Sequence, residues 1–98
     1  YKGEHMKYII INDQKYLIMK DVKEAVDEEE IAKRLTDYFL QFDYIVGDWA
    51  YGKLRLKGFN SKANPNFKNI NDIDKVEEYI NNYCAYGCKY FILSKENE

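Results

Sequence analysis

Residues 44–59 (YIVGDWAYGKLRLKGF) carry the pattern that most restricts what this chain can fold into. If Tyr51-Gly52 is a two-residue loop, the apolar residues on either side of it pair with one another across two antiparallel strands. A three-residue loop would place Trp49 opposite Lys53, so the pattern selects its own register. We therefore predict a β-hairpin whose tight turn holds Tyr51 at positive φ. Its apolar face consists of Ile45, Gly47, Trp49, Leu54, Leu56 and Gly58.

The opposite face of this hairpin is polar and aromatic. In the selected register Asp48 lies directly across from Arg55, which predicts a charge pair with a structural role. The face as a whole consists of Tyr44, Val46, Asp48, Lys53, Arg55, Lys57 and Phe59.

Hydrophobic periodicity and turn residues predict the elements before this hairpin. Two β-branched and aromatic runs, residues 7–12 and 15–20, indicate a first hairpin around the turn-forming Asn12-Asp13-Gln14. Asp27 and Glu30 match a capping box, and they introduce a helix over residues 28–42. Apolar residues recur on one face of this helix at Ile31, Leu35, Tyr38, Phe39 and Phe42.

The elements after the hairpin follow from the same rules. Residues 60–69 are rich in Asn and hold the only proline, which is typical of an exposed loop. A second helix begins after Asn71 or Asp72, and Gly87 then ends that region in a left-handed conformation. Residues 88–94 form a last strand. The apolar stripe of the second helix is Ile73, Val76, Ile80 and Tyr83, with Tyr79 flanking it.

These elements give the order ββαββαβ in a chain of 98 residues, which has room for one domain. We predict a single α+β domain with a mostly antiparallel sheet and two helices packed on one face of it. Hydrophobic residues at 46% and charged residues at 33% exclude disordered and collagen-like classes. Residues 1–5 match no periodic pattern and are interpreted as a frayed leader or an expression remnant, so the predicted domain spans residues 6–98.

The sequence also indicates a compartment. No apolar run approaches the roughly 18 residues that span a bilayer, and no secretory signal is visible. We therefore expect a cytoplasmic protein with no membrane partner, while its oligomeric state stays open.

Charge is distributed unevenly along the chain. The formal net charge is −2, yet residues 53–69 hold five Lys/Arg and no Asp/Glu. Cations interleaved with aromatic residues on an open sheet suit single-stranded nucleic acid, because cations bind phosphates and rings stack on bases. An ordinary solvated strand shows the same alternation. The candidate ligand-binding residues are Tyr44, Lys53, Arg55, Lys57, Phe59, Lys62, Phe67 and Lys68.

Little in the sequence indicates catalysis or a metal. Cys84 and Cys88 are predicted to be buried structural thiols, because free Cys is among the most buried residue types. The only histidine is His5, in the leader, so a tetrahedral metal site lacks ligands. No nucleophile-elbow or phosphate-loop spacing occurs, and we predict no catalytic residue, metal or cofactor.

The string DYIVGDW (residues 43–49), the Tyr51-Gly52 turn, LRLKGF (residues 54–59) and the YCAYGCKYF segment (residues 83–91) resemble the YutD-like family of small bacterial proteins. The resemblance covers nearly the whole chain from about Met6. It implies a compact cytoplasmic α+β domain from Gram-positive-type bacteria, and it implies no reaction, cofactor or catalytic residue.

Three functional hypotheses follow. The first is a non-catalytic binding module that contacts RNA or another polyanion through the basic and aromatic hairpin face. The second is a protein-interaction adaptor that uses exposed tyrosines, which are enriched at interfaces. The third and weakest is a small enzyme that uses Asp48 with a tyrosine or Cys84.

Overall fold

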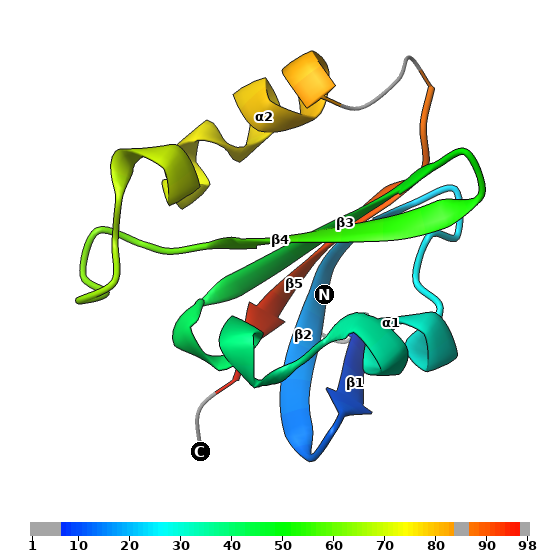
Figure 1. Cartoon of the computed structure of the whole chain (residues 1–98), viewed down its shortest axis with the longest axis horizontal. Coiled ribbons are helices and arrows are strands. Elements are labelled where there is room, and N and C mark those ends of the chain that lie inside the picture. The colour runs from blue at the N-terminus through cyan, green and yellow to red at the C-terminus, as the bar shows by residue number, and fades with distance from the viewer. Residues whose placement is uncertain (1–6, 84–86, 97–98) are drawn as a thin grey trace, which may run out of the picture.

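The computed structural model describes residues 7–83 and 87–96, and its five strands form one antiparallel sheet (Figure 1). The strands lie in the order β1-β2-β5-β3-β4, so the last strand of the chain occupies the centre of the sheet. The predicted α+β class and the element order are confirmed. The strands are β1 (Lys7–Ile11), β2 (Gln14–Val22), β3 (Tyr44–Ala50), β4 (Lys53–Phe59) and β5 (Tyr90–Lys95).

Both predicted hairpins form around two-residue turns with positive φ. The β1–β2 turn consists of Asn12 and Asp13, with φ of 50° and 71°, while Gln14 already belongs to β2. The β3–β4 turn consists of Tyr51 and Gly52, with φ of 55° and 75°. Turns of this type match the right-handed twist of the strands, which is why short hairpins use them. The predicted β3–β4 register is confirmed, from Tyr44 opposite Phe59 to Ala50 opposite Lys53.

The predicted first helix is divided in two. Helix α1 spans Glu28–Arg34, and a 3₁₀ helix, η2, spans Asp37–Gln41. Leu35 and Thr36 between them have extended backbone. The end of α1 finds another hydrogen-bond donor, because Asn12 Nδ2 donates to Leu35 O over 2.9 Å and to Ala32 O over 3.4 Å. The break lets the buried Leu35 and Phe42 both enter the core although they do not lie on one continuous helix.

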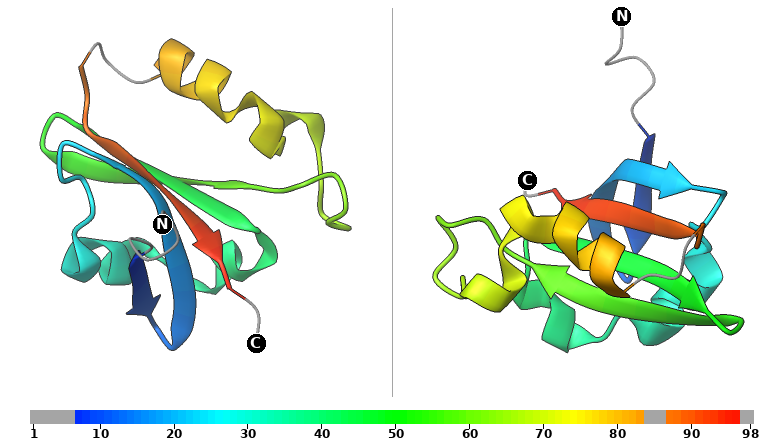
Figure 2. Two further views of the ribbon diagram at one scale, coloured as in Figure 1. Left: turned by 180° about the vertical axis from the view of Figure 1, so that it is seen from behind. Right: turned by 90° about the horizontal axis from the view of Figure 1, so that it is seen from above.

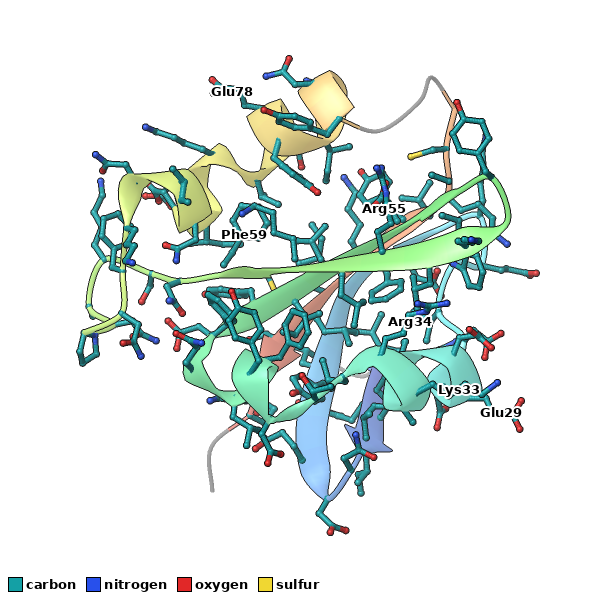
Figure 3. The ribbon with its side chains drawn as sticks, in the orientation of Figure 1. Glu29, Lys33, Arg34, Arg55, Phe59 and Glu78 are labelled. Atoms are coloured by element: carbon teal, nitrogen blue, oxygen red, sulfur yellow. The ribbon has the colours of Figure 1, made fainter. Side chains whose placement is uncertain are left out.

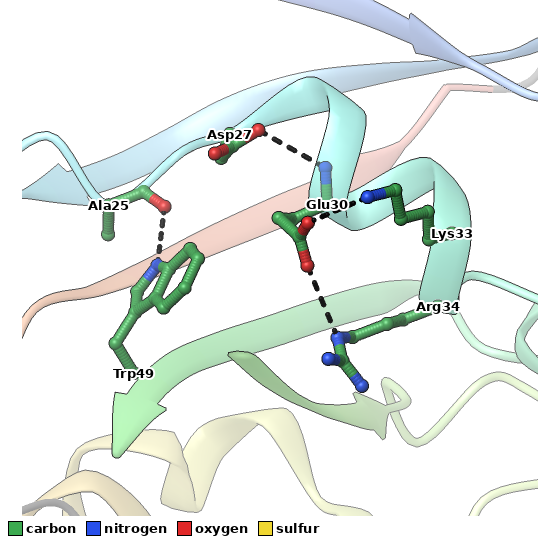
Figure 4. A network of polar contacts seen from close by, with 6 residues as sticks. All are labelled: Ala25, Asp27, Glu30, Lys33, Arg34 and Trp49. Atoms are coloured by element: carbon green, nitrogen blue, oxygen red, sulfur yellow. Dashed lines mark hydrogen bonds and ion pairs between the residues drawn. The ribbon is translucent and has the colours of Figure 1, made fainter. Parts of the chain in front are cut away.

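Asp27 caps the start of α1 as predicted, and a hydrogen bond fixes the segment before the helix to the sheet (Figure 4). The Asp27 side chain accepts from Glu30 N over 3.1 Å, and the Glu30 side chain lies 3.1 Å from Lys33 Nζ. The Trp49 indole donates from Nε1 to Ala25 O over 2.9 Å. Trp49 of β3 therefore fixes the segment that leads into α1 to the sheet.

The second helical region comprises the short 3₁₀ helices η3 (Asn69–Asn71) and η4 (Ile73–Lys75), followed by α2 (Val76–Tyr83). Asp72 caps η4, because its side chain accepts from Asp74 N over 3.0 Å. Ile80 is buried as the apolar stripe predicts, whereas Tyr83 is largely exposed. Gly87 has a φ of 70°, as expected for a residue that ends this region.

The two helices lie on opposite faces of the sheet, so the prediction that both pack on one face is wrong (Figures 1 and 2). The central strand β5 explains the difference, because it is apolar on both sides. Phe91 and Leu93 belong to the larger cluster with Ile31 of α1, and Ile92 belongs to a second cluster with Ile80 of α2. The second cluster consists of Val46, Phe59, Ile80 and Ile92, with Tyr44, Ile73, Val76, Tyr79 and Tyr90 packed against it.

Candidate binding surface

Helix α2 covers the aromatic part of the hairpin face that the sequence assigns to a polyanion. Phe59 is only 2% exposed, and its ring packs edge-on against Tyr79 with centroids 5.4 Å apart. Tyr44 is half-buried in the same cluster. Figure 3 shows Phe59 beneath α2. The prediction that Phe59 is an open stacking platform is therefore wrong, because the opposite placement of α2 buries its ring. Burial also raises the pKa of Tyr79.

The predicted pair of Asp48 and Arg55 forms. Asp48 is the carboxylate that the third hypothesis assigned to catalysis. Asp48 is buried, and the Arg55 guanidinium donates to its carboxylate and, over 3.1 Å, to Tyr83 O. The hydrogen bond to Asp48 raises the pKa of Arg55. The pair therefore joins β3, β4 and the end of α2, which gives Asp48 a structural role.

The remaining predicted ligand residues spread over different surroundings. Lys57 is half-buried, with Nζ 5.1 Å from the Phe59 ring centroid and 5.8 Å from that of Tyr79. Lys53, Lys62 and Lys68 are exposed, whereas Phe67 is half-buried in the loop. The structure thus brings Tyr44, Lys57 and Phe59 together beneath a helix and does not bring the eight residues together as one open face.

The cysteine predictions have a mixed outcome. Cys84 lies outside the described residues. Cys88 is half-buried and disulfide-bonded, which differs from the buried free thiol expected from residue statistics. Gly87 has positive φ and turns the chain immediately before Cys88. The prediction rested on how often free Cys is buried, and this frequency does not include the local backbone geometry. Over the residues that the structure describes, no group of three His, Cys, Asp or Glu side chains could hold a metal ion, and no helix has the length and apolar character to cross a membrane.

A groove of about 310 Å³ lies beside β4, on the side of the sheet that faces η2. Two exposed apolar side chains stand at it, Tyr38 of η2 at 62% and Ile70 of η3 at 77% exposed. Figure 1 shows β4 with η2 on one side of it and the loop that leads to η3 beyond its end. The groove is lined by Tyr38, Phe39, Gln41, Phe42, Leu56, Lys57, Gly58, Asn66, Lys68, Ile70 and Asn71.

Strand β4 is an edge strand. Its backbone N–H and C=O groups point alternately toward β3 and away from it, and the β3–β4 turn determines which residues point which way. Lys53 closes the two-residue hairpin with Ala50, so Lys53 and every second residue after it bond to β3. Leu54, Leu56 and Gly58 consequently turn their N–H and C=O groups outward. Within residues 7–83 and 87–96, no hydrogen bond to these outward groups is formed.

The next outward residue, Asn60, shows that this edge accepts a neighbouring chain. Asn60 N donates to Asn71 O over 2.7 Å, and Asn60 O accepts from Ile73 N over 3.0 Å, in a parallel bridge with Asp72. The protein therefore uses the end of the β4 edge for its own chain, and the groove begins where this pairing ends.

A polar cluster around the buried Asn60 fixes the start of the loop that leads to the far wall of the groove. Asn60 is fully buried, and its Oδ1 accepts from Asp43 N over 2.8 Å and from Asn64 Nδ2 over 2.9 Å. Asp43 in turn accepts from Asn64 Nδ2 over 3.0 Å and from Ser61 N over 3.0 Å. These hydrogen bonds hold residues 60–64 against the start of β3, while Asn60 Nδ2 is buried without a partner among the described residues.

Sequence reasoning missed the residues that make this groove apolar. Tyr38, Phe39 and Phe42 were assigned to the core face of one continuous helix, but the break after Arg34 places Tyr38 at the surface. Ile70 could have been recognised from the sequence as an exposed apolar residue, since it is a single large apolar residue between two asparagines, directly after the predicted loop. Lys57 and Lys68, which the sequence proposed as ligand residues, do line the groove.

Comparisons with known proteins agree on one family. The profile of the family described as "Putative antitoxin YutD-like" matches residues 10–94 of this chain. A protein of Bacillus subtilis (strain 168) named "Putative antitoxin YutD" is 39% identical over 87 residues, which are 89% of this chain and 96% of that protein. The solution NMR structure of protein yutD from B. subtilis matches with a TM-score of 0.76 and 37% identity, over 94% of this chain and 84% of that chain. The fold and its sequence are thus shared along nearly their whole length.

Proposed function

The chain belongs to the YutD-like family, and from this premise we propose that it is a non-catalytic module that binds a partner protein in the manner of an antitoxin. A protein antitoxin neutralises its toxin by forming a complex with it, so this function requires an accessible surface of the interface type. The observation that carries the proposal is the groove of about 310 Å³ beside the free edge of β4.

The side chains at the groove have the chemistry of a protein interface. Interface cores are enriched in aromatic residues and depleted of charge. Tyr38 and Phe39 of η2 and Phe42 directly after it supply three rings to the lining of the groove. Ile70 adds an exposed aliphatic side chain, and the exposed Lys68 lies with it as a polar margin. Isolated apolar residues on a surface need no explanation, but a hollow with apolar groups on two of its walls favours an occupant.

A photo-crosslinker tests this proposal. p-Benzoylphenylalanine replaces Tyr38 in the native host, and after irradiation we expect a covalent adduct with one protein that persists through nuclease treatment and high salt. The captured protein is then purified and titrated against the unmodified chain. Tyr38→Ala and Ile70→Ala should each weaken the reconstituted complex by about tenfold or more, as truncation of a buried interface anchor does.

The matched control places the crosslinker at Tyr51, which is fully exposed at the tip of the β3–β4 hairpin and away from the groove. Equal crosslinking from positions 38 and 51, or a reconstituted complex insensitive to both alanine variants, would contradict protein binding at the groove.

Polyanion binding is the second candidate, and the exposed Lys53, Lys62 and Lys68 in the acid-free stretch of residues 53–69 favour it. It would act through phosphate contacts without stacking on Phe59. The crosslinking experiment separates the two candidates, because an adduct that disappears with nuclease and high salt would favour nucleic acid over protein.

A further inference from the structure

We propose that the free edge of β4 takes up an extended segment of the partner protein as an additional strand, and that this segment alternates apolar and acidic residues. The inference rests on the proposed function and specifies how the partner is recognised. Strand addition of this kind draws affinity from main-chain hydrogen bonds and specificity from pockets for alternate side chains.

The backbone of β4 supplies the first part of the argument. The outward N–H and C=O groups of Leu54, Leu56 and Gly58 form a ladder along an edge that the sheet order leaves open. Asn60 continues the same ladder and is already paired with the chain at Asn71 and Ile73. An incoming strand would therefore extend a pairing that this edge has begun.

The two sides of β4 supply the second part. Successive side chains of a strand point to opposite faces, so an added strand presents alternate residues to two different environments. On the η2 side it meets the groove, whose walls include Tyr38, Phe42 and Ile70. On the α2 side its neighbours are Lys53, Arg55 and Lys57. Apolar residues suit the first environment, and acidic residues suit the second because opposite charges across neighbouring strands stabilise a pair.

The same charges argue against a second copy of this chain at the edge. An antiparallel pairing of two β4 strands centred on Leu56 would set Arg55 of each copy directly opposite Lys57 of the other. Like charges in directly opposite positions are destabilising, and Asp48 already pairs with the Arg55 of its own chain. Lysines on an open edge also hinder nonspecific association, which leaves an acidic segment as the complementary occupant.

The test uses synthetic peptides, so the protein itself is unchanged. The probe is a short capped peptide of alternating valine and glutamate, titrated into ¹⁵N-labelled protein. We expect chemical-shift changes and slowed amide exchange at Leu54, Leu56 and Gly58, with none at Tyr8 and Ile10 of β1 on the other edge. A peptide of valine and lysine should bind at least about tenfold more weakly, because it reverses the charge complementarity.

Backbone methylation separates strand addition from simple charge attraction. In an added strand only every second amide faces β4. N-methylation of one alternate set, either all valines or all glutamates, should therefore abolish binding, while methylation of the other set leaves it within about twofold. The set that matters identifies the strand direction. Equal effects of the two sets, or exchange that slows at β1 instead, would overturn the inference.

Variants of the protein give an independent measurement. Lys53→Glu should reduce affinity for the valine–glutamate peptide by about tenfold, whereas Lys7→Glu, at an exposed lysine of β1, should not. A native partner that crosslinks at position 38 yet leaves amide exchange at Leu56 and Gly58 unchanged would refute strand addition and keep the proposed function. Failure to find any native partner would refute the proposed function, whatever the peptides do.

Discussion

The hydroxyl of Tyr16 is the clearest energetic defect in the core. Tyr16 is fully buried in the larger cluster, and among the described residues its hydroxyl has no hydrogen-bond partner. A buried hydroxyl without a partner has lost its hydrogen bonds to water and gained none in return. Tyr16→Phe should therefore raise the free energy of unfolding by about 1 kcal/mol, measured by urea denaturation at neutral pH. A loss of stability would show that the hydroxyl has a partner in solution.

Tyr16 should also make the stability of the wild type and of Tyr16→Phe differ at alkaline pH. Burial raises the pKa of Tyr16 above its ordinary value of about 10 in the folded protein. The free energy of unfolding is therefore unaffected by this group below about pH 10 and falls above it, because the tyrosine loses its proton at lower pH in the unfolded chain than in the folded protein. Tyr16→Phe should lose less stability than the wild type above pH 10. Part of the decline should remain in the variant, since burial also raises the pKa of Tyr79.

Single residues also show how far sequence reasoning reaches. The cap at Asp27, the positive φ of Tyr51 and the pairing of Asp48 with Arg55 follow from local chemistry and were predicted correctly. The burial of Phe59 was not predicted, because a strand pattern shows which residues share a face but not what covers that face.

At the scale of elements, the break between α1 and η2 is the feature that the sequence did not predict. A helical period continues through residues 28–42, so periodicity alone favours one helix. The carbonyl groups at the end of α1 instead find a donor in Asn12, which is distant in sequence and becomes a neighbour only when the first hairpin packs. Tyr38 lies in η2, directly after this break, and is exposed beside the groove.

This contact can be removed without changing the turn. Asn12→Asp keeps a residue type that tolerates positive φ but lacks the amide donor, and it places an anion near the negative end of α1. We expect it to lower the free energy of unfolding by about 1 kcal/mol, from thermal or urea denaturation. Asp13→Asn is the matched control at the other turn position, with φ of 71°, and should change stability by less than about 0.5 kcal/mol. Equal effects of the two substitutions would assign the loss to the turn rather than to the end of α1.

For the whole molecule, the placement of the helices decides what surface is left for function. The sequence predicted the strands and their facing residues, since alternation is local, but the side on which a helix docks depends on connections that one sequence does not fix. With α1 and α2 on opposite faces, both faces of the central strands are covered, and β1 and β4 remain as the edges of the sheet. The groove beside β4 is a consequence of this layering.

The layering makes a prediction about energetic coupling. Ile31 of α1 and Ile80 of α2 belong to clusters separated by the sheet. Ile31→Val and Ile80→Val should each cost about 1 kcal/mol, and the double variant should lose the sum within about 0.5 kcal/mol, because distant sites without shared partners are additive. Phe59→Leu and Tyr79→Leu are the coupled reference, since their rings lie 5.4 Å apart on one face. Coupling between Ile31 and Ile80 as large as between these two rings, in urea unfolding of all variants, would contradict helices on opposite faces. Additivity is the result expected when the two helices pack independently on opposite faces of the sheet.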